Sequence, residues 1–158
     1  MGAPFIESGL VKLIAGYASH PEIPTRDPSF HQLQLAKHPE DFELKKLFFS
    51  AVNILCLQND CPLVLDYLSR SQFMMALFVY VVPINKSVET EWSLAEFEEL
   101  QLHAMAVLAA YAPLCLGDYK TFQGSSRILK MLDWCINTGS LFFFRKNSLY
   151  FRILLKNF

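Results

Sequence analysis

The residues of this sequence that are best suited to chemistry are its histidines, carboxylates and cysteines, so their spacing is considered first. His103 follows Glu99 by one helical turn, which would place two possible metal ligands on one helix face. No second ligand pair accompanies them. The cysteines also lack the C-x-x-C spacing of a zinc site: Cys56, Cys61, Cys115 and Cys135. We therefore predict no metal and no cofactor, and we expect a partly buried His103 and reduced thiols.

A second possible site is the run Gly124-Ser125-Ser126-Arg127, which resembles a phosphate cradle at a helix start. It lacks the lysine and the glycine spacing of a P-loop, so a turn followed by a helix capped at Ser125 or Ser126 is the better interpretation. Nucleophile-elbow, zinc-protease and dinucleotide motifs do not occur in the sequence. The sequence therefore predicts a protein that is not an enzyme and takes no small-molecule substrate.

Composition favours a folded protein with a substantial core. Of the 158 residues 53% are hydrophobic and 18% charged, and the formal net charge is −1, which gives no basic field for nucleic acid. Residues 100–117 carry no charge, but Gln101, His103 and Pro113 interrupt them, so we expect a helix packed in protein instead of a membrane span. No signal peptide is visible, and the expected location is the cytoplasm.

Helical periodicity runs through most of the chain. The pattern predicts a helix around residues 10–17, a proline-rich linker at about 19–38, and a helix from Pro39 to about 58. The apolar stripe expected on that helix comprises Leu44, Leu47, Phe48, Ala51, Val52 and Leu55. Further helices are predicted at 62–68, 73–82, 93–111, 114–119 and 125–137. The helix that begins at Ser93 has a capping box with Glu96 and a hydrophobic staple between Trp92 and Phe97.

Two blocks of the chain share one pattern, residues 43–55 and 99–111. Each long helix is followed by a short helix near a proline, a turn and a third apolar helix. Third helices are expected after Gly9, Ser71 and Gly124. Helix triplets that repeat in this way are typical of armadillo arrays, so the predicted fold is all-α, an armadillo-like α-solenoid over residues 1–137. An irregular helical bundle is the alternative.

Three stretches carry a family resemblance: Asp41-Phe42-Glu43-Leu44-Lys45-Lys46-Leu47, Glu98-Glu99-Leu100-Gln101-Leu102-His103-Ala104 and Leu132-Asp133-Trp134-Cys135. They resemble the cilia- and flagella-associated protein 69 family, armadillo-type proteins of motile cilia and the sperm flagellum. The resemblance covers about residues 3–135 and marks the chain as a fragment of a longer protein. It implies a non-enzymatic scaffold that binds other proteins in a ciliary or flagellar axonemal assembly. An armadillo adaptor for peptides or cargo in the cytoplasm outside cilia is the alternative.

Residues 138–158 differ from the rest of the chain. From Leu141 onward they contain six aromatic and four basic residues and no acid. A basic amphipathic helix that binds a membrane or a partner is one interpretation. We favour a tail that packs poorly.

A partner-binding face is predicted on the last helix of the array. Leu129, Leu132 and Ile136 are its expected buried stripe, which would leave another face for three residues at i, i+3 and i+7: Arg127, Lys130 and Trp134. An aromatic residue beside two cations suits a protein interface. Alternatively, Trp134 covers the end of the core or packs against a following unit.

Overall fold

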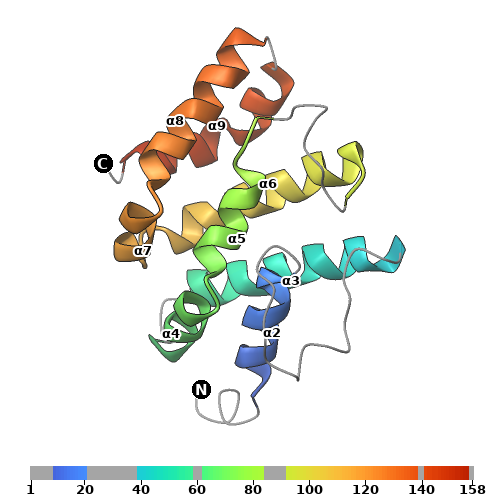
Figure 1. The fold of residues 1–158 in the computed structure, drawn as a ribbon, viewed down its shortest axis with the longest axis vertical. Coiled ribbons are helices and arrows are strands. Elements are labelled where there is room, and N and C mark those ends of the chain that lie inside the picture. The colour runs from blue at the N-terminus through green and yellow to red at the C-terminus, as the bar shows by residue number, and fades with distance from the viewer. Residues whose placement is uncertain (1–8, 21–38, 59–61, 84–91, 139–140, 157–158) are drawn as a thin grey trace.

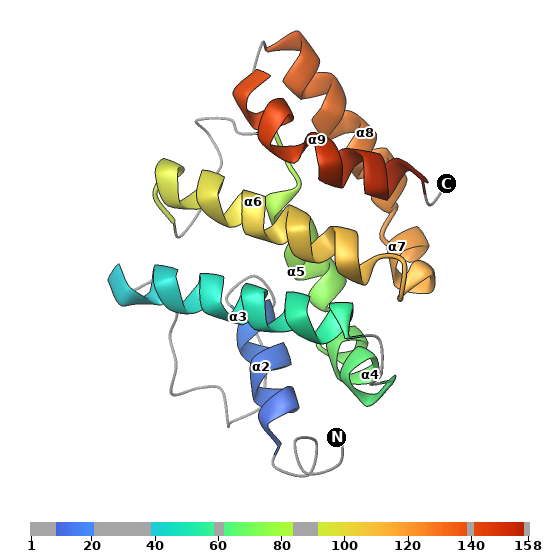
Figure 2. The ribbon, with the colours of Figure 1, turned by 180° about the vertical axis from the view of Figure 1, so that it is seen from behind.

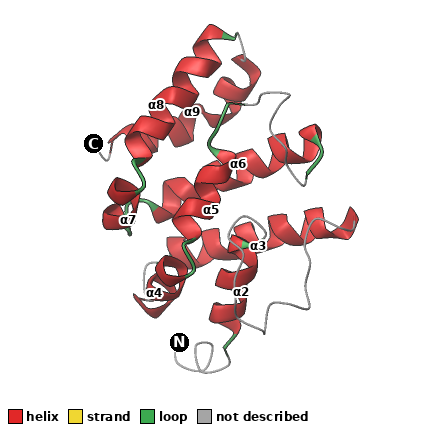
Figure 3. Cartoon of the chain, in the orientation of Figure 1, coloured by secondary structure: helices red, strands yellow, loops and turns green. Residues whose placement is uncertain are grey.

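The computed structural model describes residues 9–20, 39–58, 62–83, 92–138 and 141–156, without the side chains of residues 39 and 141–148. Within these ranges the chain forms helices and no strand (Figures 1 and 3), which confirms the all-α prediction. The helices are α2 (Leu10–Ser19), α3 (Pro39–Leu57), α4 (Pro62–Arg70), α5 (Phe73–Tyr80), α6 (Leu94–Tyr111), α7 (Leu116–Thr121), α8 (Gly124–Asn137) and α9 (Leu141–Lys156). Most of the predicted linker, residues 21–38, lies outside the described ranges.

The helices are arranged in two rows. Helices α3, α6 and α9 lie side by side and run parallel in one row (Figure 2). Helix α6 is in the middle of this row and packs against both α3 and α9. Helices α2, α5 and α8 each pack against the long helix that follows them in sequence, α3, α6 and α9 respectively. This repetition of one long and one third helix is the layered arrangement of an armadillo array.

Each third helix begins in the same way. The residue before it has a left-handed backbone: Gly9 before α2 (φ 72°), Gln72 before α5 (φ 54°) and Gln123 before α8 (φ 56°). The expected caps at Ser125 or Ser126 are therefore wrong, because the tight turn at Gln123 starts α8 at Gly124. Two of the three turns use glutamine where glycine is the usual residue, so residue type alone does not mark them.

The capping box that starts α6 is confirmed. The Ser93 N–H donates to Glu96 Oε2 at 2.9 Å, and the Glu96 N–H donates to Ser93 Oγ at 3.4 Å. Trp92 and Phe97, the two residues of the predicted staple, are both buried. These contacts fix the direction in which α6 enters the core.

The buried line of α3 differs from the predicted stripe. Its fully buried residues include Lys45, Phe49 and Val52, whereas Leu47 is exposed. The prediction counted apolar residues, but α3 packs against α2 on one side and α6 on another. Lys45 bonds to the end of α2 and is buried there, so the buried face of α3 includes a lysine and leaves Leu47 exposed.

Lys45 and Gln101 are fully buried polar residues that connect neighbouring units. Lys45 Nζ donates to the carbonyls of Ala18 and His20 at the end of α2, each at 2.6 Å. Gln101 Nε2 donates to the carbonyls of Tyr80 and Val82 at the end of α5, at 2.6 Å and 3.0 Å. Each side chain thus satisfies carbonyls that a helix end leaves without a partner in the helix.

The structure also differs from the expected tail. Residues Leu141–Lys156 form α9, whose Phe151 and Leu154 are buried, and α9 packs against both α6 and α8. Helix α6 lies between α3 and α9 (Figure 2), and the apolar residues of α9 pack on the side of α6 that faces away from α3. This packing explains why the segment is ordered as a helix. Helix α9 therefore extends the row of long helices beyond the boundary expected at residue 137.

Candidate interaction surface

The three residues predicted to bind a partner lie on α8, and each has a different environment. Lys130 is exposed. Trp134 is half-buried and packs against the core, as the alternative interpretation expected. Arg127 is half-buried: its Nε donates to the Phe122 carbonyl at 3.0 Å, and its guanidinium lies 5.3 Å from the centre of the Phe78 ring. Arg127 thus joins α8 to α5, and Lys130 is the most accessible of the three side chains.

The buried stripe of α8 is one residue away from the predicted one. Ile128, Met131 and Cys135 are fully buried, while Leu129 and Ile136 are 52% and 65% exposed. Two apolar lines run along this helix about 100° apart, and only the tertiary contacts decide which of them faces the core. Leu129 and Ile136, which were expected in the core, therefore lie on the surface.

A similar exposed pair lies at the other end of the array. Leu47 and Ile54 on α3 are 62% and 56% exposed, and like Leu129 and Ile136 they are seven residues apart. Leu47 was expected in the core, and Ile54 was not part of the predicted stripe, so the sequence did not predict this exposed pair. Exposed apolar residues on one helix face are candidates for an interface.

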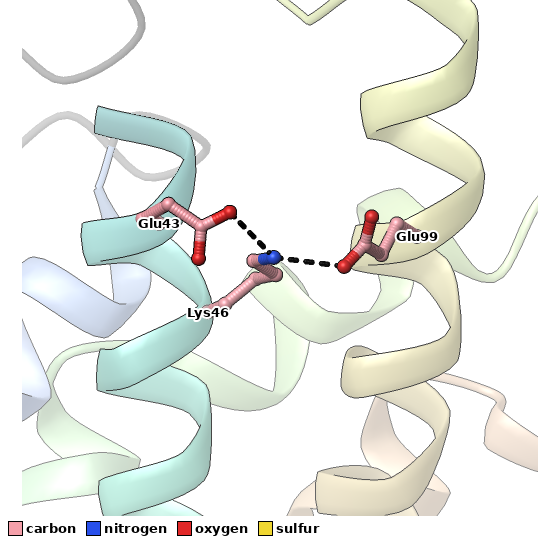
Figure 4. A network of polar contacts seen from close by, with 3 residues as sticks. All are labelled: Glu43, Lys46 and Glu99. Atoms are coloured by element: carbon pink, nitrogen blue, oxygen red, sulfur yellow. Dashed lines mark hydrogen bonds and ion pairs between the residues drawn. The ribbon is translucent and has the colours of Figure 1, made fainter. Parts of the chain in front are cut away.

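An ion-pair network connects α3 to α6 beside this surface (Figure 4). Lys46 Nζ lies 2.7 Å from Glu43 Oε1 on its own helix and 2.8 Å from Glu99 Oε1 on α6. Hydrogen bonds to Glu43 and then Glu99 raise the pKa of Lys46 above its usual value. The lysine is charged at neutral pH and bridges two long helices.

His103 lies close enough to this network for Lys46, Glu99 and Glu43 to act on its titration. Desolvation lowers its pKa below the usual value, and the nearby Lys46 lowers it further, against a smaller opposing effect of Glu99. In the described part of the chain, no group of three or more histidine, cysteine or acidic residues is placed to hold a metal ion. Its position fits the predicted partly buried histidine.

The described cysteines are buried or half-buried, and burial raises their pKa values. Burial raises the pKa of the Cys56 thiol to about 12 and also raises the pKa values of Cys115 and Cys135. These three thiols are free and protonated at neutral pH, so they are poor nucleophiles and poor metal ligands. Cys61 lies outside the described residues.

The other sequence-based possibilities also have structural explanations. Gly124 is buried with the Tyr119 ring against it, so the run that begins there packs as a helix start. Residues 100–117, the uncharged stretch, contain the larger part of α6 and the first two residues of α7. None of the described helices combines the length and apolar character needed to cross a membrane.

Comparison with known proteins identifies the architecture. Residues 1–152 match the family model described as "Cilia- and flagella-associated protein 69, ARM repeat". The match extends beyond Cys135, where the sequence resemblance was expected to end, and includes most of α9. No solved structure matches the chain.

Curated relatives agree with this match. The chain is 41% identical over 141 residues to cilia- and flagella-associated protein 69 of Mus musculus, which covers 89% of the chain and 15% of that protein. It is 40% identical over 148 residues to the Homo sapiens protein of the same name, covering 94% of the chain and 15% of the relative. The chain thus corresponds to a small part of the length of these relatives.

Proposed function

The chain belongs to the cilia- and flagella-associated protein 69 family, and we propose that it is a non-enzymatic scaffold contributing armadillo surface to a ciliary or sperm-flagellar axonemal assembly. The observation that carries this proposal is the repeated packing in which each third helix contacts the long helix that follows it and consecutive long helices contact one another. Such arrays act through shape and area, because stacked helices share a core and leave extended faces for other proteins.

The chemistry of the described residues supports a role without catalysis. The three described thiols have raised pKa values, and the Glu43–Lys46–Glu99 network ties two helices together. His103 is partly desolvated between these helices. Each of these titratable groups therefore has a structural explanation that requires no substrate.

Helix α8 supplies the proposed contact with a protein partner. Lys130 is an exposed cation on the face that also carries Arg127 and Trp134. The exposed Leu129 adjoins Lys130 and adds apolar area to that surface. Tryptophan and arginine are enriched among the residues that carry most of the binding energy of protein interfaces.

Localisation in ciliated cells tests the ciliary proposal. A tagged copy of the chain should remain with axonemes after detergent extraction of the membrane. A diffuse cytoplasmic signal that detergent removes would instead favour the alternative, an armadillo adaptor for peptides or cargo outside cilia. The matched control is the same tag fused to an unrelated helical domain of similar size.

A charge reversal on α8 tests the proposed contact. Lys130→Glu should reduce the recovery of axonemal proteins with the chain and leave its circular-dichroism spectrum unchanged, because Lys130 is exposed. Arg127→Glu should reduce recovery too, but it also removes the hydrogen bond to Phe122 and is expected to lower stability. Unchanged recovery with the folded Lys130→Glu variant would exclude this face.

A further inference from the structure

Comparison of α3 with α6 shows which surfaces the repeat itself uses. Lys45 and Gln101 perform the same task in the two helices, so they define equivalent positions. In this alignment Leu44, Leu47, Ala51 and Ile54 of α3 correspond to Leu100, His103, Val107 and Ala110 of α6. Both sets have the spacing i, i+3, i+7 and i+10, which places each set on one helix face.

On α6 this face lies toward α3. Leu100 and Val107 are almost completely buried, and the pKa of His103 between them is lowered partly by Lys46 of α3. The face is therefore the one that α6 uses to pack against the preceding long helix.

On α3 the equivalent face is open. Leu47 and Ile54 are exposed, and Leu44 and Ala51 are half-buried. We call these four residues the open face of α3. It is as apolar as its counterpart on α6, and the helix beside α3 in the row, α6, packs against another side of α3.

The charges beside this face repeat as well. Glu99 accepts a hydrogen bond from Lys46 of the preceding long helix at 2.8 Å, and Glu43 occupies the equivalent position on α3. The Glu43 side chain is 71% exposed and pairs with Lys46 of its own helix (Figure 4). A second cation on the outer side of α3 would therefore complete the same arrangement.

We infer that the open face of α3 is a docking site for the long helix of a further armadillo unit, running parallel to α3 and carrying a lysine or arginine that reaches Glu43. The contact between α3 and α6 is the established interface that this one continues. The curated relatives are several times longer than the part they share with this chain, so family polypeptides have room for such a unit. The inference does not depend on a ciliary location.

A synthetic peptide of residues 39–58 is a suitable probe, because it carries the side of α3, with Lys46, that packs against α6. The complete chain should bind the labelled peptide in a fluorescence anisotropy titration under reducing conditions. Leu47→Lys/Ile54→Lys in the chain should weaken binding at least about tenfold, by removing apolar contact area. The matched control is Leu129→Lys/Ile136→Lys, which changes an equally spaced exposed pair at the other end of the array and should leave binding unchanged.

A charge exchange tests the role of Glu43. Lys46→Glu in the peptide should weaken binding about two- to fivefold, the range of a solvent-exposed ion pair, and Glu43→Lys in the chain should restore it. No binding at millimolar peptide, or binding that survives Leu47→Lys/Ile54→Lys, would overturn the inference. The inference would also be overturned if the chain dimerised in analytical ultracentrifugation and Leu47→Lys/Ile54→Lys abolished the dimer. The open face of α3 would then bind a second copy of the chain. Circular dichroism confirms that each variant is folded.

Discussion

Lys45 and Gln101 hold equivalent positions in two consecutive long helices, and each donates hydrogen bonds to two carbonyls at the end of the third helix before it. One residue is a lysine and the other a glutamine, yet both are completely buried. The geometry is repeated while the residue type is not. The repeat is thus held by a backbone requirement, the satisfaction of helix-end carbonyls, in addition to apolar packing.

Replacing either residue should destabilise the fold. Lys45→Met and Gln101→Met keep the approximate volume but leave buried carbonyls without their donors, at a cost of about 1–3 kcal/mol each in the free energy of unfolding. Urea denaturation measures this quantity. Lys46→Met is the control, since its ion pairs involve exposed carboxylates and should contribute less than about 1 kcal/mol. An equal loss for Lys46→Met and Lys45→Met would contradict the assigned role of Lys45.

The capping box of α6 should contribute less stability than the core of the same helix. Ser93→Ala removes an N-cap acceptor and should cost about 0.5–2 kcal/mol. Leu108 is fully buried, so Leu108→Ala should cost about 2–5 kcal/mol through lost burial and a cavity. The reverse order in urea denaturation would mean that the inner face of α6 is wrongly assigned.

Gly124→Ala should reverse the usual effect of this substitution in a helix. Alanine ordinarily stabilises a helix by about 0.5–1 kcal/mol relative to glycine. At Gly124 the added Cβ would overlap the buried Tyr119 ring, so we expect a loss of about 1–3 kcal/mol. Gly117→Ala in α7 meets no atom within 4 Å and should be neutral or stabilising. In thermal melts followed by circular dichroism, Gly124→Ala should therefore lower the melting temperature, and Gly117→Ala should leave it unchanged or raise it.

His103 should titrate below the ordinary histidine value of 6.5, because desolvation and Lys46 disfavour its cation. As the pH falls through 6.5, His103 is protonated in the unfolded state before it is protonated in the folded state. The free energy of unfolding therefore decreases between pH 6.5 and the lowered pKa. Nuclear magnetic resonance of the imidazole protons measures the midpoint directly. Lys46→Met should move that midpoint upward, and a wild-type midpoint at or above 6.5 would indicate a solvated His103.

The parts of the fold that depend on neighbouring residues in sequence could be predicted. The capping box needs only Ser93 and Glu96, and the repeat needs only helical periodicity, so both were accessible from the sequence. The role of Lys45 was not, because a lysine inside an apolar helix has no visible partner until α2 lies against it. Leu47 was expected in the core because helical spacing does not show which side of α3 the neighbouring helices cover.

The proposed partner surface was only partly predictable. Helical spacing correctly places Lys130 on an exposed face of α8, but it could not distinguish Leu129 from Ile128 as the core residue. Arg127 looked like a free cation because its contacts, the Phe78 ring and the Phe122 carbonyl, belong to other segments. The packing of α9 was also missed, since a basic, aromatic composition says nothing about the side of α6 that receives it.

The central position of α6 has a consequence for how the chain folds. Helix α6 packs against α3, α5 and α9, so it connects the first half of the array to the second. In an array where units contact only their neighbours, structure spreads from one unit to the next, and cooperativity depends on the unit in the middle. A destabilising substitution in α6 should therefore divide one unfolding transition into two. A destabilising substitution in α2 or α9 should unfold only the helices at that end of the array.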